Sequence, residues 1–319
     1  MIDERELVEA VRRLKAGDLV AFPTETVYGL GADARNPAAI AKIYALKRRP
    51  SAHPLIVHLA SIDELAGWAA HVPDAAVRLA ERFWPGPLTL ILPRAAGVAD
   101  ALTGGQSSIG LRVPSHPVAQ GLLRAFGGAI AAPSANRYGR VSPTTAQHVR
   151  DEFDGDMPLL LDGGACSVGL ESTIVSCLDG LLLVRPGGIP ATALEAVVGP
   201  LRRAQPEEGP RAPGTTLSHY APATPLRVLP PEIFAGAVGA ETAVLGHGPR
   251  PARFAGPLWI DAGDEPLSYG HDLYANLRKL DRAGARSIIV AAPPVGTAWE
   301  AVRDRLARAA AACSAEEIA

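Results

Sequence analysis

The chain has 319 residues, of which 48% are hydrophobic and 20% are charged, and its formal net charge is -2 at pH 7. This composition suits a globular protein with a sizeable core, and it excludes a general electrostatic attraction to nucleic acid or to an anionic membrane. The cysteines Cys166, Cys177 and Cys313 form no C-x-x-C pair, which argues against a zinc ribbon or a disulfide framework. Because the chain opens without a long apolar run and contains none of membrane-spanning length, we expect a cytoplasmic protein with no membrane contact.

Short apolar runs alternate with helical patterns over the first 200 residues, which predicts an α/β domain at 1–200. A serine at Ser61 with Glu64 three residues later resembles a capping box, and Ser142 followed by Pro143 predicts a second helix start. The runs that we expect to be strands lie at 19–22, 55–59, 88–92, 108–113, 129–132, 159–161, 172–177 and 181–184.

The composition changes at 201–224, where proline, glycine and charged residues dominate and no period holds, so this segment is predicted to be a linker or surface loop. Beyond it, apolar runs alternate again with helical patterns at 267–283 and 297–311. The second set of runs (226–229, 242–247, 257–262 and 286–294) predicts a smaller α/β domain at 225–319 with a mostly parallel sheet.

Two polar clusters follow the first predicted strand. The segment 22–31 (FPTETVYGLG) is rich in hydroxyls and glycines, and it is either a ligand loop or a capped turn. Lys47 continues the apolar helical stripe of Ile40 at i+7, so it should lie at the edge of the buried face. Lys47 and Arg49 therefore either complement the helix dipole before Pro50 or clamp a triphosphate.

Two further polar side chains stand within predicted strands. His58 should share one strand face with Ile56, and no second ligand stands at metal-binding spacing, so a zinc site is not expected. Arg112 lies inside an apolar strand, where an unpaired charge is costly. It therefore requires either an internal carboxylate or the carboxylate or phosphate of a ligand.

Three more clusters carry small, hydroxyl or glycine residues: APSAN at 132–136, LESTIV at 170–175 and RPGG at 185–188. In α/β proteins, ligands bind at the ends of strands, where small and hydroxyl residues of this kind are found. The same residues also form ordinary turns. The chain has no P-loop, no G-x-G-x-x-G fingerprint and no G-x-S-x-G elbow. An ATP site in this protein would therefore be of a different kind.

The order of these blocks is more specific than any one of them. The succession PTETVYGLG, KRRP, HPLIVH, LRVPSHP, APSAN, ESTIV and RPGG over residues 19–188 closely resembles the threonylcarbamoyl-AMP synthase family. The segment 213–222 is similar to the interdomain linker of its two-domain members. The resemblance implies a YrdC-type domain with a twisted mixed sheet, followed by a smaller Rossmann-like α/β domain.

The resemblance also implies roles for individual residues. L-threonine would be bound by five residues: Thr26, His58, Arg112, Ala132 and Ser172. ATP would be bound by eight: Lys47, Arg49, His53, Ser108, Ser134, Ser142, Arg185 and Tyr220. His53 stands where the family usually has asparagine, and the linker segment 215–218 (TTLS) lacks the cation that many members place there.

The implied reaction joins L-threonine, bicarbonate or CO₂ and ATP into L-threonylcarbamoyl-AMP and releases pyrophosphate. It requires no protein nucleophile, so catalysis would rest on positioning by Lys47 and Arg49, with Mg²⁺ held by the ATP phosphates. The linker with His219 and Tyr220 would act as a lid. A tRNA threonylcarbamoyl transferase complex would use the product to modify the adenosine next to the anticodon, and a weak contact with tRNA is compatible with this scheme.

Two other functions compete with this one. An RNA-binding module could use the basic residues 47–49, but the net charge is weak and aromatic platforms are lacking. A carbamoyltransferase acting on carbamoyl phosphate could share the same scaffold, because a fold alone does not define the chemistry. The linker and second domain favour the threonine enzyme.

Overall fold

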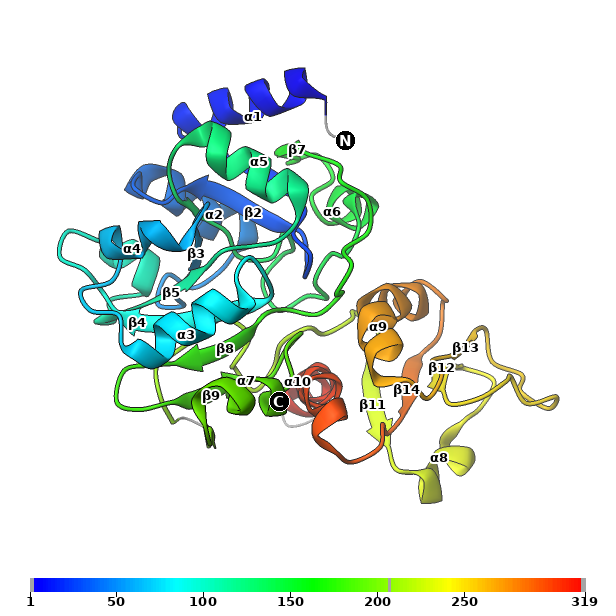
Figure 1. Ribbon diagram of the computed structural model, residues 1–319. Coiled ribbons are helices and arrows are strands. Elements are labelled where there is room, and N and C mark those ends of the chain that lie inside the picture. The colour runs from blue at the N-terminus through cyan, green and yellow to red at the C-terminus, as the bar shows by residue number, and fades with distance from the viewer. Residues whose placement is uncertain (1–2, 206–207, 317–319) are drawn as a thin grey trace. The chain divides into compact units, whose positions relative to one another are not determined.

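The computed structural model describes residues 3–205 and 208–316, which fall into two compact units (Figure 1). The first unit comprises Met1–Tyr138 and Pro143–Thr215, and the second comprises Gly139–Ser142 and Thr216–Ala319. Residues 201–215 of the expected linker thus belong to the first unit, and residues 216–224 belong to the second.

The described part of the first unit is built on a mixed sheet with the strand order β10-β9-β8-β4-β5-β3-β6-β2-β1-β7. The pair β3–β5 is parallel and the pair β4–β5 is antiparallel, which confirms the mixed sheet expected from the sequence. The strands are β1 Val20–Phe22, β2 Gly29–Asp33, β3 Ile56–His58, β4 Leu88–Pro93, β5 Ser108–Arg112, β6 Ile130–Ala131, β7 Leu159–Leu160, β8 Thr173–Ser176, β9 Leu182–Arg185 and β10 Arg202–Arg203.

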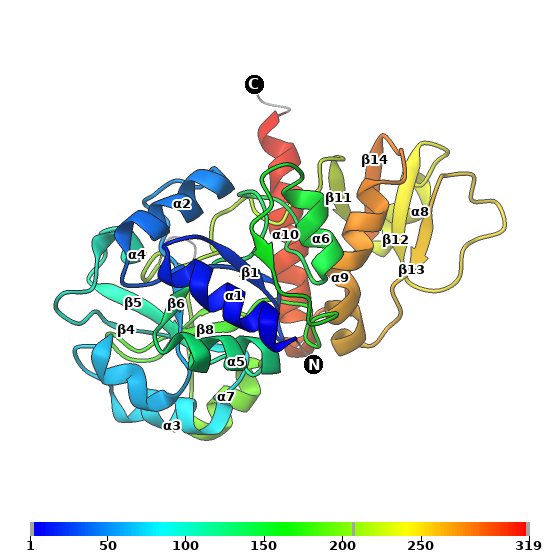
Figure 2. The same cartoon turned by 90° about the horizontal axis from the view of Figure 1, so that it is seen from above.

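Helices cover the two faces of this sheet unequally. One face, with Val57 and Leu111, forms the main core with residues of α2, α3 and α7. On the other face, Ile130 packs against α1 and α5, which lie side by side (Figure 2). The helices are α1 Glu4–Lys15, α2 Pro37–Lys47, η1 Ile62–Gly67, α3 Asp74–Phe83, α4 Asp100–Thr103, α5 Pro117–Phe126, α6 Ala146–Glu152 and α7 Ala191–Val198.

The rest of that second face is covered by an irregular segment. Ile56 of β3, Ile91 of β4 and Ile174 of β8 pack against Ala212. We call residues 208–215 the strap. Because apolar side chains on an open sheet face would otherwise meet water, the strap completes the burial of this face.

Some local expectations were wrong. The segment Ser142-Pro143 does not begin a helix, because the Pro143 carbonyl accepts from the Tyr28 amide at 2.9 Å. Helix α6 begins at Ala146 instead, with the Thr145 hydroxyl accepting from the His148 amide.

Two other segments differ from the sequence prediction. The glycine-rich end of segment 22–31 continues into β2, which pairs with β1. Gly31 is needed there, because a Cβ atom would lie 2.7 Å from the Phe22 ring. Strand β10, within the expected linker, adds two residues in parallel to β9.

In the second unit, every paired strand of the described sheet is parallel, in the order β11-β14-β12-β13. This confirms the Rossmann-like arrangement, although α8 was not predicted. The strands are β11 Leu226–Leu229, β12 Thr242–Gly246, β13 Trp259–Asp261 and β14 Ser287–Ala291. The helices are α8 Pro231–Ala237, α9 Pro266–Asp281, η2 Thr297–Trp299 and α10 Glu300–Glu316. Among the described residues, no helix combines the length and the apolar character needed to cross a bilayer.

Candidate active site

Polar side chains gather on the sheet face that the strap covers. The register of β3 and β5 places His58 opposite Arg112. Because side chains alternate along a strand, Ser108 lies on the same face as Arg112, whereas Val57 and Leu111 point into the main core. Three of the expected ligand-binding residues therefore share one face.

Arg112 is the centre of a buried polar network. Its Nη1 donates to the Thr26 hydroxyl at 2.9 Å, and its Nη2 lies 2.8 Å from Oε1 of Glu25. Its Nε donates to the Gly86 carbonyl at 3.2 Å. Two of the expected threonine-binding residues are thus in direct contact, and the internal ion pair that the sequence left open is present.

Glu25 is a member of this network that the sequence reasoning missed. Its side chain is 5% exposed, and its other carboxylate oxygen accepts from the Ser115 amide at 3.1 Å. Burial acts to raise the pKa of Glu25, but the charge of Arg112 and its hydrogen bond outweigh burial and hold this pKa below its usual value. The sequence indicated that Arg112, a cation in an apolar strand, needs a partner such as a carboxylate, but it did not indicate that Glu25 is this partner.

His58 is buried beside this ion pair. Its Nδ1 has no hydrogen-bond partner within the described chain, and its ring meets the Phe22 ring edge-on at 6.3 Å. Burial first, and then the charge of Arg112, lower the pKa of His58 to about 3. The imidazole is therefore neutral near pH 7 and presents an unpaired polar atom to the site.

The low pKa of His58 predicts acid sensitivity. The unfolded chain takes up a proton on His58 below pH 6.5, whereas the folded chain does so only near pH 3. Above pH 6.5 His58 is neutral in both states and adds no penalty, and on acidification from there towards pH 3 the free energy of unfolding should fall by about 1.4 kcal/mol per pH unit. Urea unfolding between pH 7 and pH 4 should show a shallower decline for His58→Gln than for the unchanged protein. Equal slopes would contradict this assignment.

Lys47 joins helix α2 to the APSAN segment. It is 1% exposed, so it lies deeper than the edge of the buried face at which its i+7 position placed it. Its Nζ donates to the carbonyls of Ser134 (2.6 Å) and Asn136. Its own carbonyl accepts from the Tyr138 amide at 2.8 Å. Burial, followed by the charge of Arg49, lowers the pKa of Lys47 well below its usual value. Lys47 and Ser134 are thus brought together, but through the main chain of Ser134.

Arg49 and His53 form a second polar group with Tyr138. The Arg49 Nη2 donates to the Pro54 carbonyl at 2.9 Å, and its guanidinium lies 5.6 Å from the Tyr138 ring centre. The Tyr138 hydroxyl is 3.4 Å from Nε2 of His53. Burial first, and then the charge of Arg49, lower the pKa of His53. Tyr138 was not among the expected residues, although an aromatic residue just after APSAN is visible in the sequence.

Arg185 links the ESTIV segment to the strap. Its Nη2 donates to the Ser172 carbonyl at 2.8 Å, and its Nη1 donates to the Pro213 carbonyl at 2.7 Å. The Ser172 hydroxyl in turn lies 2.7 Å from the Thr89 hydroxyl on β4. Ala132 is anchored to β3 by its amide, which donates to the Ile56 carbonyl at 3.0 Å.

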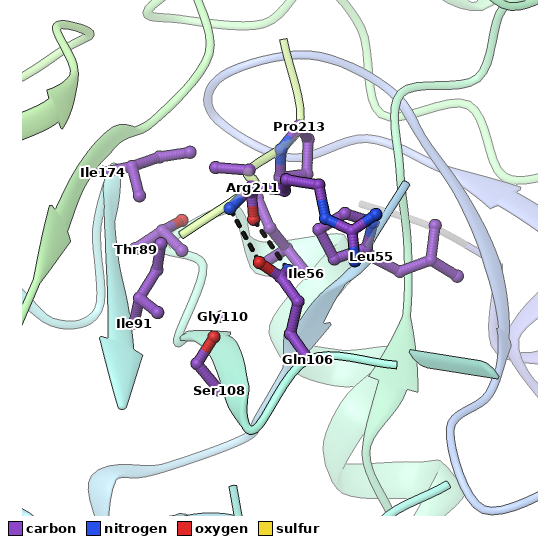
Figure 3. Close-up of a pocket in the computed structure, with 12 residues that line it drawn as sticks. Leu55, Ile56, Thr89, Ile91, Gln106, Ser108, Gly110, Ile174, Arg211 and Pro213 are labelled. Atoms are coloured by element: carbon purple, nitrogen blue, oxygen red, sulfur yellow. Dashed lines mark hydrogen bonds between the residues drawn. The ribbon is translucent and has the colours of Figure 1, made fainter. Parts of the chain in front are cut away.

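Ser108 lines a pocket between the sheet and the strap (Figure 3). The Gln106 side chain closes this pocket by pairing with the main chain of Arg211. The cavity is only about 10 Å³, which is the space of about one water molecule. The other walls are Pro54, Leu55, Ile56, Thr89, Ile91, Gly110, Ile174, Ala212 and Pro213.

Two of the expected ATP-binding residues, Ser142 and Tyr220, belong to the second unit. Within that unit, the Tyr220 ring stacks on Tyr274 at 5.7 Å, and the Arg305 guanidinium lies 5.2 Å from its ring centre. Ser142 is fully buried. All the other expected residues lie in the first unit.

Family models match both parts of the chain. The model described as Telomere recombination (Sua5_yciO_yrdC) matches residues 12–187, which is more than half of the chain. The model described as the C-terminal domain of threonylcarbamoyl-AMP synthase matches residues 189–311.

Individual relatives agree with these matches. Threonylcarbamoyl-AMP synthase of Pyrococcus abyssi is 36% identical over 97% of this chain and 95% of its own length. The Bacillus subtilis enzyme of that name is 45% identical over 71% of this chain and 67% of its own length. The crystal structure of P. abyssi Sua5 complexed with L-threonine matches with a TM-score of 0.91 at 36% identity, covering 98% of this chain and 96% of that one. The chain therefore belongs to the threonylcarbamoyl-AMP synthase family.

Proposed function

We propose that the chain makes L-threonylcarbamoyl-AMP from L-threonine, bicarbonate or CO₂, and ATP, with release of pyrophosphate. The observation that carries this proposal is a cluster in the first unit, in which His58 and Arg112 share one sheet face and Thr26, from the loop after β1, contacts Arg112. The relatives' names and the threonine complex of P. abyssi Sua5 support the same reaction. The motif order favours it over the two competing functions.

The buried network offers complementary groups for a small amino acid. A guanidinium has five N–H donors, and the contacts of Arg112 with Thr26, Glu25 and Gly86 leave donors for a ligand carboxylate. His58 is neutral with a free Nδ1, so it can meet a polar ligand atom without repelling an ammonium group. Ser172 and Ala132 would complete the threonine subsite.

The nucleotide would lie against the second polar group. Arg49, His53, Ser134 and Ser108 would bind the ATP, and Lys47 would position the Ser134 segment through its carbonyl contacts. A magnesium ion would be held by phosphate oxygens and water and would offset phosphate charge. The described residues contain no group of three or more His, Cys, Asp or Glu side chains placed to hold a metal.

The reaction balances without a protein nucleophile. The threonine amine attacks CO₂ and loses a proton to give a carbamate. A carbamate oxygen then attacks the α-phosphorus, and the bond to the β-phosphate breaks as pyrophosphate leaves. The protein holds the reactants in line and keeps water away from the labile carbamate and adenylate. The expected roles of Arg185, Ser142 and Tyr220 towards ATP remain predictions.

The strap is the part of the expected lid that the first unit contains. Its pocket at Ser108 is too small for a nucleotide, so the strap would have to shift for ATP to reach this serine. The product would pass to a tRNA threonylcarbamoyl transferase complex, with at most weak contact between this chain and tRNA. The reaction would consume ATP, and its product would be used to modify tRNA. For this reason we propose that it takes place in the cytoplasm.

A pyrophosphate-release assay tests the reaction directly. We expect release only when ATP, Mg²⁺, bicarbonate and L-threonine are all present, and mass spectrometry should find threonylcarbamoyl-AMP. Each component is omitted in turn, and serine and valine replace threonine as matched controls. Turnover with carbamoyl phosphate but without threonine would indicate the carbamoyltransferase, and steeply salt-dependent RNA binding without turnover would indicate the RNA module.

A further inference from the structure

The main chain of the strap is fixed at Arg211. The Gln106 side-chain amide donates to the Arg211 carbonyl at 3.0 Å, and the Arg211 amide donates back to Oε1 of Gln106 at 2.7 Å (Figure 3). One side chain thereby satisfies both main-chain groups of Arg211. This two-bond contact sets where the Arg211 side chain leaves the strap.

The Arg211 side chain lies against residues that precede β3 and β5. Its Nη2 donates to the Gly104 carbonyl at 2.8 Å, and the side chain extends towards Leu55 (Figure 3). Gly104 packs closely on the loop between α2 and β3, so a Cβ atom at this position would lie 2.2 Å from the Ala52 carbonyl oxygen. The guanidinium is therefore held over the loop that also carries His53.

Arg211 forms no ion pair with any carboxylate that the structure describes. Within the described chain, no carboxylate lies within ion-pair distance of its guanidinium, whereas Arg202 at the start of the linker pairs with Glu208 at 2.8 Å. The field of Arg211 also reaches the site, because its charge, after burial and the charge of Arg49, contributes to lowering the pKa of His53. The positive charges of Arg211 and Arg49 thus act on the same loop, at His53, and this favours a polyanionic ligand there.

We propose that Arg211 is a further phosphate-binding residue, which the strap contributes to the β- and γ-phosphates of ATP. This inference rests on the proposed function and assigns part of its nucleotide site. It also resolves a departure in the sequence, because segment 215–218 lacks a cation and Arg211, upstream of Pro213, supplies one. Since negative charge grows on the leaving pyrophosphate, a guanidinium there stabilises both bound ATP and the departing group.

The test compares Arg211→Ala with Arg211→Lys and Arg203→Ala in the full chain. Arg203 is a linker arginine whose side chain is 43% exposed and lies 4.0 Å from Glu195, so its loss is a matched charge control. Pyrophosphate-release rates give KM for ATP and for threonine, and product inhibition gives Ki for pyrophosphate. We expect Arg211→Ala to raise KM for ATP and Ki for pyrophosphate about tenfold, with threonine KM unchanged. Arg211→Lys should be intermediate, and Arg203→Ala should match the unchanged protein.

A second variant separates charge from strap attachment. Gln106→Ala loosens the main chain of Arg211 but keeps its charge, so we expect a smaller rise in KM for ATP and a non-additive effect in the double variant. Equal ATP and pyrophosphate constants for Arg211→Ala and Arg203→Ala would overturn the inference. So would an equal rise in both substrate KM values, which would indicate a loosened strap and no phosphate contact. If the unchanged protein releases no pyrophosphate, the proposed function itself fails.

Discussion

Replacing Lys47 with methionine should reduce ATP turnover about a hundredfold, because a small displacement of a positioning segment can cost that much. The methionine keeps most of the buried side-chain volume but removes the Nζ contacts with the Ser134 and Asn136 carbonyls. Two carbonyl groups lose a donor, so the free energy of unfolding should also fall by about 2 kcal/mol. Steady-state pyrophosphate release and urea unfolding measure the two effects separately.

A second lysine on the same helix provides the control. Lys42 is half-exposed and pairs with Asp18 at 2.9 Å, so Lys42→Met removes a cation from α2 without touching the APSAN segment. Its turnover should stay within about twofold of the unchanged protein, as expected for a surface ion pair. A normal rate in Lys47→Met would instead assign Lys47 only the helix-dipole role.

Arg112→Ala should raise the KM for threonine about tenfold or more and lower the free energy of unfolding by about 3–5 kcal/mol. The first effect follows if the guanidinium receives the threonine carboxylate. The second follows because the Glu25 carboxylate, 5% exposed, loses its ion-pair partner. Threonine-dependent pyrophosphate release and urea unfolding measure these effects.

The double variant Glu25→Gln/Arg112→Ala distinguishes binding from stability. It removes the stranded carboxylate, so much of the lost stability should return, while the KM for threonine should remain high. If the double variant instead recovers a normal threonine KM, Arg112 serves only to neutralise Glu25. The KM for threonine of the single variant Glu25→Gln shows how far the carboxylate fixes the position of Arg112.

Local patterns in the sequence predicted much of the site. The alternation around Ile56 and His58 placed them on one strand face, and the structure confirms it, with Leu55 and Val57 in the main core. The i+7 spacing from Ile40 likewise placed Lys47 at the edge of the buried face, and the structure buries it more deeply. These predictions succeeded because strand and helix periods depend only on neighbouring residues.

The remaining features depend on contacts between distant segments. Glu25 meets Arg112 across 87 positions, and Gln106 meets Arg211 across 105, so no local pattern reveals either pair. The same reason explains the failed helix start at Ser142-Pro143, since the Pro143 carbonyl is taken by Tyr28. A buried charge in the sequence shows that a partner is needed, but the tertiary fold decides which residue it is.

In the contact between Gln106 and the strap, the strap contributes only the main-chain amide and carbonyl of Arg211, whereas Gln106 contributes its side chain. Any amino acid except proline offers the same amide and carbonyl, so a substitution at position 211 can leave this contact intact. The position that resists change lies outside the strap, at Gln106, whose amide provides both the donor and the acceptor. A chain with another residue at position 211 can therefore retain the same attachment of the strap, provided that an amide side chain persists two residues before β5.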